Sequence, residues 1–249
     1  MNNLLVILSL ETATLGGSIF LARGVDGLAA KKGDAKISHS NSLLADIAEC
    51  LGEAGLTLLD VELFACASGP GSFTGLRIGI ATLKALAATL QRPCVGVPTL
   101  HSIAHSAGIS NRTVAVLPAG RGEVFTQLFS VSADDQVIEL DTAAHLSPQG
   151  LIERYAHCAD LVWAGSGAHL HRSLLQTYAE QHDLSSFDCA AGSNVALKGW
   201  GLAAPAPNLA QHVSALALRS FALGQLQDAE TLSAIYVRPS DAETRQPWQ

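Results

Sequence analysis

An acidic residue beside two threonines offers the first candidate chemistry in this sequence. Glu11 opens the segment ETAT, and Thr12 and Thr14 supply hydroxyl groups close to it in the chain. A carboxylate in a hairpin turn can position a hydrated magnesium ion near a phosphate group. The same residues also suit an ordinary polar turn, because one acid without a second ligand is a poor metal site. Both interpretations of Glu11, Thr12 and Thr14 stay open as a nucleotide-binding candidate.

The segment SGPGSFTGLRIG, residues 68–79, is the second candidate, because its glycines precede a helical pattern. It is not a Walker loop, since five residues separate Gly69 from Gly75 and Leu76 stands where lysine is required. The bare backbone could bind an anion at the start of the helix. Alternatively, Gly75 and Gly79 lie four residues apart on one helical face and let another backbone come close. We favour the packing interpretation.

Two histidines complete the candidates. His101 and His105 are spaced i, i+4 and would share a helix face, which suits a metal ion. No H-E-x-x-H pattern and no obvious third ligand accompany them, so we expect packed or surface histidines. The sequence also lacks the G-x-S-x-G elbow of a serine hydrolase. No catalytic residue and no metal site are therefore predicted.

Composition restricts the possible partners. The 249 residues are 48% hydrophobic and 15% charged, with a formal net charge of −7, which fits a globular fold and argues against tight direct binding of nucleic acid. No apolar run approaches about 18 residues and the N-terminus has no basic start, so we expect neither a membrane span nor a signal peptide. The five cysteines are widely spaced and typical of reduced thiols in a cytoplasmic protein. They are Cys50, Cys66, Cys94, Cys158 and Cys189.

Apolar periodicity predicts two halves with the same order of elements. Strands are expected in the first half over 4–10, 18–24, 28–33, 61–67 and 94–97, and helices over 40–54 and 74–90. Strands are expected in the second half over 113–119, 123–131, 136–140, 161–165 and 187–191, and helices over 148–158, 168–181 and within 206–226. The first three strands should be antiparallel.

A duplicated βββαβαβ unit predicts an α/β fold with two lobes, the ribonuclease-H-like architecture of actin, Hsp70 and sugar kinases. We place the N-terminal lobe, with the glycine segment, at 1–106 and the C-terminal lobe at 107–249. The last helix could pack back on the N-terminal lobe. Fold alone does not give function.

At this point the sequence resembles a known family. SGPGSFTGLRIGIATLKALA looks like the signature of the TsaB (YeaZ-like) proteins of threonylcarbamoyladenosine biosynthesis. Other segments resemble the family more weakly, and they occur in the family's order along nearly the whole chain. They are ILSLETAT, SHSNSLLADI, VGVPTL, GEVF and AIYVRPSDAE.

The resemblance implies a non-catalytic cytoplasmic subunit without a cofactor. Such a subunit supports a related catalytic partner, TsaD, that modifies the adenosine beside the anticodon in tRNA. The resemblance also implies an ATPase partner, TsaE, and a homodimer of the subunit when it is alone. An ATP-dependent transferase or kinase of the same fold is the alternative, and weak nucleotide handling stays compatible with either.

Two departures from the related sequences matter. TsaD-like proteins carry metal-binding histidines in NHLEGH, and the matching stretch here, PTLHSI, has Thr99 and Ile103 at the ligand places. Because His101 is shifted by two residues, it is rotated by about 200° around a helix and should not replace a ligand. Family members often show DAR before the Gly-Glu-Val motif, where this chain has Pro118 and Gly120 at the Asp and Arg places.

The helix over 74–90 is apolar on more than one side, which predicts two covered surfaces. One surface can be the chain's own sheet and the other a partner, as in half of an intermolecular four-helix bundle. The alternative is a helix buried wholly within its own fold. The predicted partner interface consists of Leu43, Ile47, Leu51, Phe73, Leu76, Arg77, Ile80 and Leu83.

Overall fold

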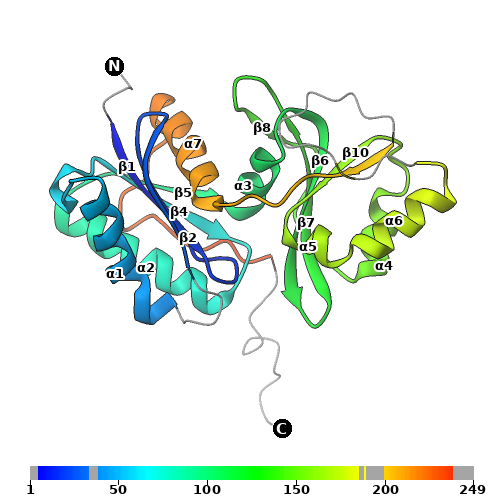
Figure 1. The fold of residues 1–249 in the computed structure, drawn as a ribbon, viewed down its shortest axis with the longest axis horizontal. Coiled ribbons are helices and arrows are strands. Elements are labelled where there is room, and N and C mark those ends of the chain that lie inside the picture. Colours follow the sequence, from blue (N-terminus) through cyan, green and yellow to red (C-terminus); the bar gives the residue numbers. More distant parts are fainter. Residues whose placement is uncertain (1–4, 34–38, 185–187, 189–198, 238–249) are drawn as a thin grey trace, which may run out of the picture.

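The computed structural model describes residues 5–33, 39–184, 188 and 199–237. Two β-sheets lie side by side, each with its own helices, and the chain passes from one to the other and back (Figure 1). Cys189 and, apart from Asp188, the strand expected over 187–191 lie outside the described residues.

The first sheet has the strand order β3-β2-β1-β4-β5. Its strands are β1 (Val6–Glu11), β2 (Ser18–Arg23), β3 (Asp26–Lys32), β4 (Leu63–Gly69) and β5 (Cys94–Pro98). The helices of this half are α1 (His39–Glu53), the short 3-10 helix η2 (Leu58–Asp60), α2 (Phe73–Leu90), α3 (Thr99–Ser106) and, from the end of the chain, α7 (Leu209–Ala222). Every residue of β1 and β4 is buried, as expected for continuous apolar runs in central strands.

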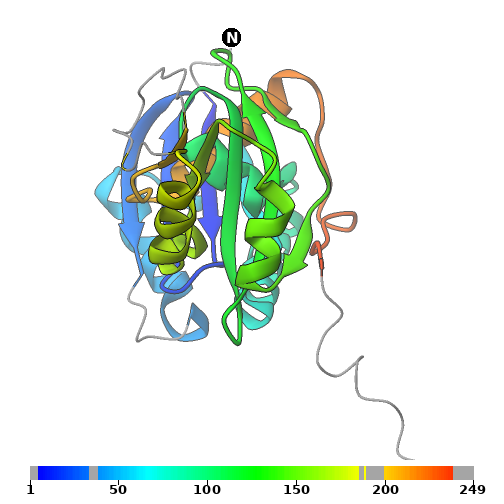
Figure 2. The ribbon, with the colours of Figure 1, turned by 90° about the vertical axis from the view of Figure 1, so that its right-hand side faces the viewer.

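The second sheet has the order β11-β10-β6-β7-β8, and β9 also pairs with β7. Its strands are β6 (Ser110–Gly120), β7 (Glu123–Val131), β8 (Val137–Glu139), β9 (Ala144–Leu146), β10 (Leu161–Ala164) and β11 (Trp200–Leu202). Its helices are α4 (Pro148–Tyr155), α5 (Ser166–Leu170) and α6 (Arg172–Gln181). In Figure 2, α4 and α6 lie in front of this sheet, where Trp163, Trp200 and Tyr155 form part of the core.

The two sheets share one topology. In each, three antiparallel strands are followed by two parallel strands added beside the first, so β1, β4 and β5 correspond to β6, β10 and β11. The predicted two-lobed α/β fold with a duplicated βββαβαβ unit is confirmed. One expected element differs, because the helix predicted over 168–181 is interrupted at His171, which has non-helical backbone angles and separates α5 from α6.

Helices α1 and α2 cover one side of the first sheet, and α7 covers the other (Figure 1). This arrangement corrects the predicted interface, because six of its residues belong to the core of the first lobe. They are Leu43, Ile47, Leu51, Leu76, Ile80 and Leu83. Leu76 and Leu83 are completely buried. The apolar stripe of the two helices covers the chain's own sheet, because the apolar side chains on each face of a sheet must be buried against another layer.

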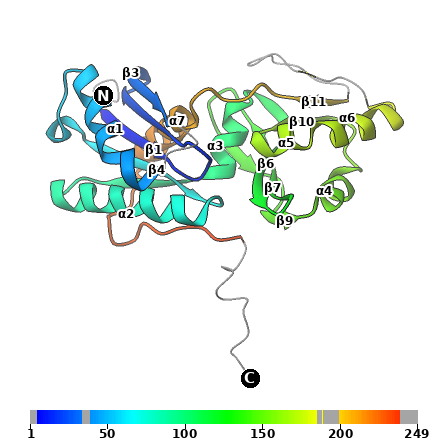
Figure 3. The same cartoon turned by 60° about the horizontal axis from the view of Figure 1, so that its bottom comes forward.

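The segment after α7 runs along the first lobe beside α2 to the last described residue, Val237 (Figure 3). Gln227 forms an isolated bridge with Cys94, and Lys84 of α2 donates hydrogen bonds to the carbonyls of Glu230 and Leu232. Farther on, the backbone N–H of Ile235 donates to the carbonyl oxygen of Ser68 at 2.7 Å. We call residues 225–237 the strap, since they hold the edge of the sheet and reach the glycine segment.

Helix α2 is long and apolar enough to cross a membrane by length and composition alone. Its inner face packs against β4, β1 and β5, which is the arrangement of a core helix. Four of the five cysteines are unpaired and buried, in agreement with the predicted reduced thiols. Burial raises the pKa of the Cys66 thiol to about 12, so this group stays protonated at neutral pH.

Candidate functional site

A cavity of about 730 Å³ lies between the lobes. The first lobe contributes the turn after β1 and the residues that precede α2, and the second contributes the end of β6 and the start of α5. The strap adds Ile235, Tyr236 and Val237 at the rim. Most of the wall is apolar, and among the described residues its charged members are Glu11 and Lys32, so the cavity has the character of a small-molecule cleft.

Glu11 lies in the wall of this cavity and is only 1% exposed. Its carboxylate accepts hydrogen bonds from the backbone N–H of Thr14 at 2.7 Å and from the Thr14 hydroxyl at 2.6 Å. Glu11 and Thr14 therefore close the turn after β1. This geometry supports the polar-turn interpretation, and a role of the two residues in nucleotide binding stays a prediction.

Thr12, the third residue of the nucleotide-binding candidate, is buried against α2 and does not line the cavity. A Cβ atom added at Gly79 would lie 2.1 Å from the Thr12 hydroxyl oxygen. The sequence placed Thr12 beside Glu11 and Thr14, but side chains of a strand end alternate in direction and Thr12 points to the helix. The structure thus separates Thr12 from the other two.

The glycines of segment 68–79 allow α2 to approach the turn after β1. A Cβ atom at Gly75 would lie 2.0 Å from the carbonyl oxygen of Thr12, and one at Gly71 would lie 2.6 Å from that of Ala13. Distances this short between nonbonded atoms are repulsive, so only glycine fits. Two N–H groups at the start of the helix also have partners within the chain. Ser72 donates its N–H to the Ala13 carbonyl at 2.8 Å, and its side chain accepts from the N–H of Gly75 at 3.2 Å. These contacts support the packing interpretation over anion binding.

Two residues of the predicted interface remain on the surface, and one of them, Phe73, also lines the cavity. Phe73 is 38% exposed and carries the exposed guanidinium group of Arg77 over its ring, 3.8 Å from the centroid. Its other neighbour is the strap residue Tyr236, with ring centroids 5.5 Å apart. Tyr236 was not among the predicted site residues, although it lies in the AIYVRPSDAE segment that carries part of the resemblance.

Thr99 and Ile103, which occupy the positions of the metal-binding histidines of TsaD-like proteins, are packed inside the fold. The Thr99 hydroxyl is buried and accepts a hydrogen bond from the N–H of Gly69 at 3.1 Å. Ile103 is 2% exposed and packs close to Gly165. Nowhere in the described ranges do three or more His, Cys, Asp or Glu side chains gather as they would around a metal ion.

His101 and His105 have structural partners. The Nε2 atom of His101 lies 3.1 Å from a carboxylate oxygen of Glu139, and its ring contacts Phe129 edge-on. Burial lowers the pKa of His101, so its ring is neutral at pH 7. His105 contacts His212, which the sequence analysis did not single out. Pro118 and Gly120, the residues that depart from the family pattern, both line the cavity.

Three comparisons place these features among known proteins. The model of the family described as tRNA N6-adenosine threonylcarbamoyltransferase (TsaD) matches residues 33–205. The tRNA threonylcarbamoyladenosine biosynthesis protein TsaB of Escherichia coli is 32% identical over 133 residues, which cover 52% of this chain and 58% of that protein. A tRNA N6-adenosine threonylcarbamoyltransferase of Aeropyrum pernix is 29% identical over 137 residues, which cover 49% of this chain and 38% of that protein.

Among solved structures, YeaZ from Pseudomonas aeruginosa superposes with a TM-score of 0.70 at 26% identity, over 94% of this chain and 100% of that one. The sequence matches to the curated relatives thus span only part of their length, while the structural match spans the whole YeaZ chain. The chain belongs to the tRNA N6-adenosine threonylcarbamoyltransferase (TsaD) family and, within it, to the TsaB (YeaZ-like) group.

Proposed function

We propose that this protein is a non-catalytic cytoplasmic subunit of the assembly that forms threonylcarbamoyladenosine in tRNA. Relatives from Escherichia coli, Bacillus subtilis and Haemophilus influenzae are named as biosynthesis proteins of this modified nucleoside. The observation that carries the non-catalytic role is the packing of Thr99 and Ile103. Both side chains are buried where the resemblance would require metal-binding histidines.

The partner would be a TsaD-like catalytic subunit of the same fold, and a TsaE-like ATPase would join the pair. A net charge of −7 disfavours tight tRNA binding by this chain alone, so tRNA would bind mainly to the catalytic partner. In the absence of partners, the subunit would form a homodimer.

The outer face of the α1–α2 layer is the surface that we propose for partner binding. The inner faces of both helices are covered by the sheet, but Ala81, Ala85 and Ala88 of α2 are exposed. Leu44 of α1 is 65% exposed, and Ala48 beside it is exposed as well. Small residues on two adjacent helices permit close approach of a second helix pair, as in a four-helix bundle. An exposed apolar surface of this kind is typical of protein interfaces.

Co-elution with a TsaD-like partner tests this surface. An arginine at Ala85 would place a long charged side chain in the interface, so Ala85→Arg should abolish the complex. Ala159→Arg is the matched control, because Ala159 is exposed in the second lobe and its substitution should leave co-elution unchanged. Intact binding by a folded Ala85→Arg variant would place the interface elsewhere. Leu83→Arg is unsuitable, since Leu83 is fully buried and the variant would fail to fold.

An ATP-dependent transferase or kinase is the second candidate, and the place of Glu11 in the wall of the interlobe cavity favours it. ATP hydrolysis by the isolated chain distinguishes the two functions. The non-catalytic subunit should show no sustained turnover. Sustained turnover that is lost in Glu11→Gln, which keeps an oxygen for the Thr14 hydrogen bonds, would support the enzyme instead.

A further inference from the structure

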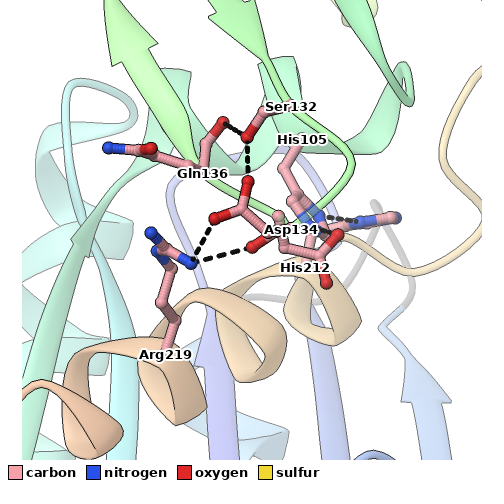
Figure 4. A network of polar contacts seen from close by, with 7 residues as sticks. His105, Ser132, Asp134, Gln136, His212 and Arg219 are labelled. Carbon is pink, nitrogen blue, oxygen red and sulfur yellow. Dashed lines mark hydrogen bonds and ion pairs between the residues drawn. The ribbon is translucent and has the colours of Figure 1, made fainter.

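A group of ionisable residues joins the lobes on the helices that connect them. Helix α3 leads from the first sheet to the second, α7 returns to the first, and the two helices contact each other. The turn between β7 and β8, residues 132–136, belongs to the second lobe and reaches both helices (Figure 4). This contact is separate from the cavity residues Glu11 and Thr14 and from the outer face of α1 and α2.

Two acidic residues of the turn provide its contacts. Arg219 of α7 donates through Nη1 to the carbonyl oxygen of Asp134 at 2.8 Å and approaches its carboxylate at 3.4 Å. The Asp135 carboxylate lies 3.2 Å from Nε2 of His105 on α3. The turn itself is closed by a hydrogen bond from the Asp135 N–H to the Ser132 carbonyl. A rigid turn of the second lobe is thus tied to both helices.

The contact between His105 and His212 limits the number of protons that the group can hold. Their Nδ1 atoms are 2.9 Å apart, so one nitrogen must donate a hydrogen and the other must accept it. A neutral pair satisfies this condition. A pair with one positive charge also satisfies it, because a doubly protonated His105 donates to His212 and to Asp135. When both rings are protonated, two N–H groups face each other and the contact must break.

The surroundings oppose the second proton. Burial and the neighbouring His105 lower the pKa of His212 to about 4, while Asp135 acts in the opposite direction. Asp134 is paired with Arg219 farther along α7. The acid of β1, which packs against α7, is Glu11, and its carboxylate is held by Thr14. His105 of α3 and Asp135 of the turn are the charged groups that act on His212.

We propose that His105 and His212 form a pH-dependent latch between helices α3 and α7, which contact each other where the lobes meet. The latch is closed while the histidine pair carries at most one positive charge. When both rings are protonated the histidine contact breaks and the two helices separate, while the Asp135 carboxylate stays beside His105. Ile103 and Ser106 of α3 and Leu209 of α7 line the interlobe cavity, so these two helices also form part of its wall. Separation of the two helices therefore loosens this part of the cavity wall.

The size of the effect follows from proton linkage. His212 has a pKa of about 4 in the closed form and of 6.5, the ordinary value, once released. The ratio of open to closed molecules should then rise by about twentyfold between pH 7 and pH 5. The effect is a property of the chain alone and does not depend on the proposed partners.

Hydrogen–deuterium exchange of the intact chain measures this opening. Protection of peptides that cover 99–108 and 205–215, corrected for the intrinsic effect of pH, should fall by about twentyfold from pH 7 to pH 5. His212→Gln should remove this dependence, because the glutamine oxygen accepts the His105 hydrogen bond but does not titrate. His157→Gln, at an exposed histidine between α4 and β10, is the matched control and should behave like the unaltered chain.

An unchanged protection of both peptides, or the same fall in His212→Gln as in the unaltered chain, would overturn the proposal. If His212→Gln does not fold, His105→Gln provides the second test. The glutamine amide can donate to a neutral His212 or accept from a protonated His212, so the change in protection between pH 7 and pH 5 should become much smaller than in the unaltered chain. Long-range ¹H–¹⁵N spectra of the imidazole groups give an independent result. A doubly protonated His212 at pH 6 in the folded chain would contradict the latch.

Discussion

The turn after β1 and the turn after β6 occupy equivalent places in the two sheets, since each joins the first two strands of a βββαβαβ unit. In the first lobe, α2 presses against the turn, and Gly75 leaves no room for a Cβ atom beside the Thr12 carbonyl. In the second lobe, Gly120 and Gly122 have φ angles of +83° and +79°, and a Cβ atom at either would meet nothing within 4 Å. Glycine thus provides space in one turn and backbone freedom in the other.

The two turns differ in how firmly each is held, although both line the interlobe cavity. The first turn is fixed by a helix of its own lobe, which places Glu11 and Thr14 rigidly in the wall of the cavity. The second turn ends at the same cavity through Gly120 but has open space around its glycines. Both turns thus border the cleft, but only the first is held in place by a helix that packs against its backbone.

The largest effect is expected for Gly75→Ala. The added methyl group would collide with a backbone oxygen that cannot rotate away, so the free energy of unfolding should fall by about 3 kcal/mol. Urea denaturation at pH 7 measures the change. Gly52→Ala is the control, because Gly52 lies in α1 with nothing within 4 Å of an added Cβ atom, and alanine is the better helix former. Equal stability of Gly75→Ala and Gly52→Ala would refute the role of close approach in the first turn.

The pH dependence of stability should show a smaller effect. The pKa of His212 is lowered to about 4 in the folded chain, so the unfolded chain binds the proton more readily. Its contribution is fully present above pH 6.5 and is lost as the pH falls toward 4, by about 2 kcal/mol between pH 7 and pH 5. Denaturation of the unaltered chain and of His212→Gln at several pH values in this range measures how the free energy of unfolding of each protein depends on pH. Parallel pH profiles of the two proteins would show that His212 does not contribute.

A substitution in the second turn should have a still smaller effect. Gly122→Ala places a Cβ atom in open space but at a positive φ, so only backbone strain of about 1 kcal/mol is expected. Gly122→Asn should lose less stability than Gly122→Ala, because asparagine tolerates positive φ better than alanine. The loss of stability in each variant is measured by thermal unfolding. A loss for Gly122→Ala as large as that for Gly75→Ala would remove the distinction between the turns.

The local pattern of the sequence predicted most elements, because strands such as β1 and β4 are continuous apolar runs and α2 carries a regular stripe. It could not show which surface would cover that stripe. A helical period reveals that Leu76 and Leu83 share a face, but both a partner and the chain's own sheet would satisfy the same period. In the folded lobe both residues are completely buried against the chain's own core, so the sheet is the surface that covers the stripe.

The site was predicted only in part, for the same reason. The sequence grouped Glu11, Thr12 and Thr14 by proximity in the chain, while the close approach of α2 turns Thr12 away from the cavity. His105 and His212 are 107 residues apart, and no local pattern links them. Contacts of this kind arise only when the two lobes are folded together.

Formation of threonylcarbamoyladenosine in a reconstituted system tests the central claim most directly. A TsaD-like partner with a TsaE-like ATPase should modify tRNA when this chain is added, and this chain without the catalytic partner should form no product. Ala85→Arg should lose the stimulation, whereas Ala159→Arg should retain it. Product formed by this chain in the absence of the TsaD-like subunit, or full stimulation by a folded Ala85→Arg variant, would contradict a supporting subunit that acts through the outer face of α2.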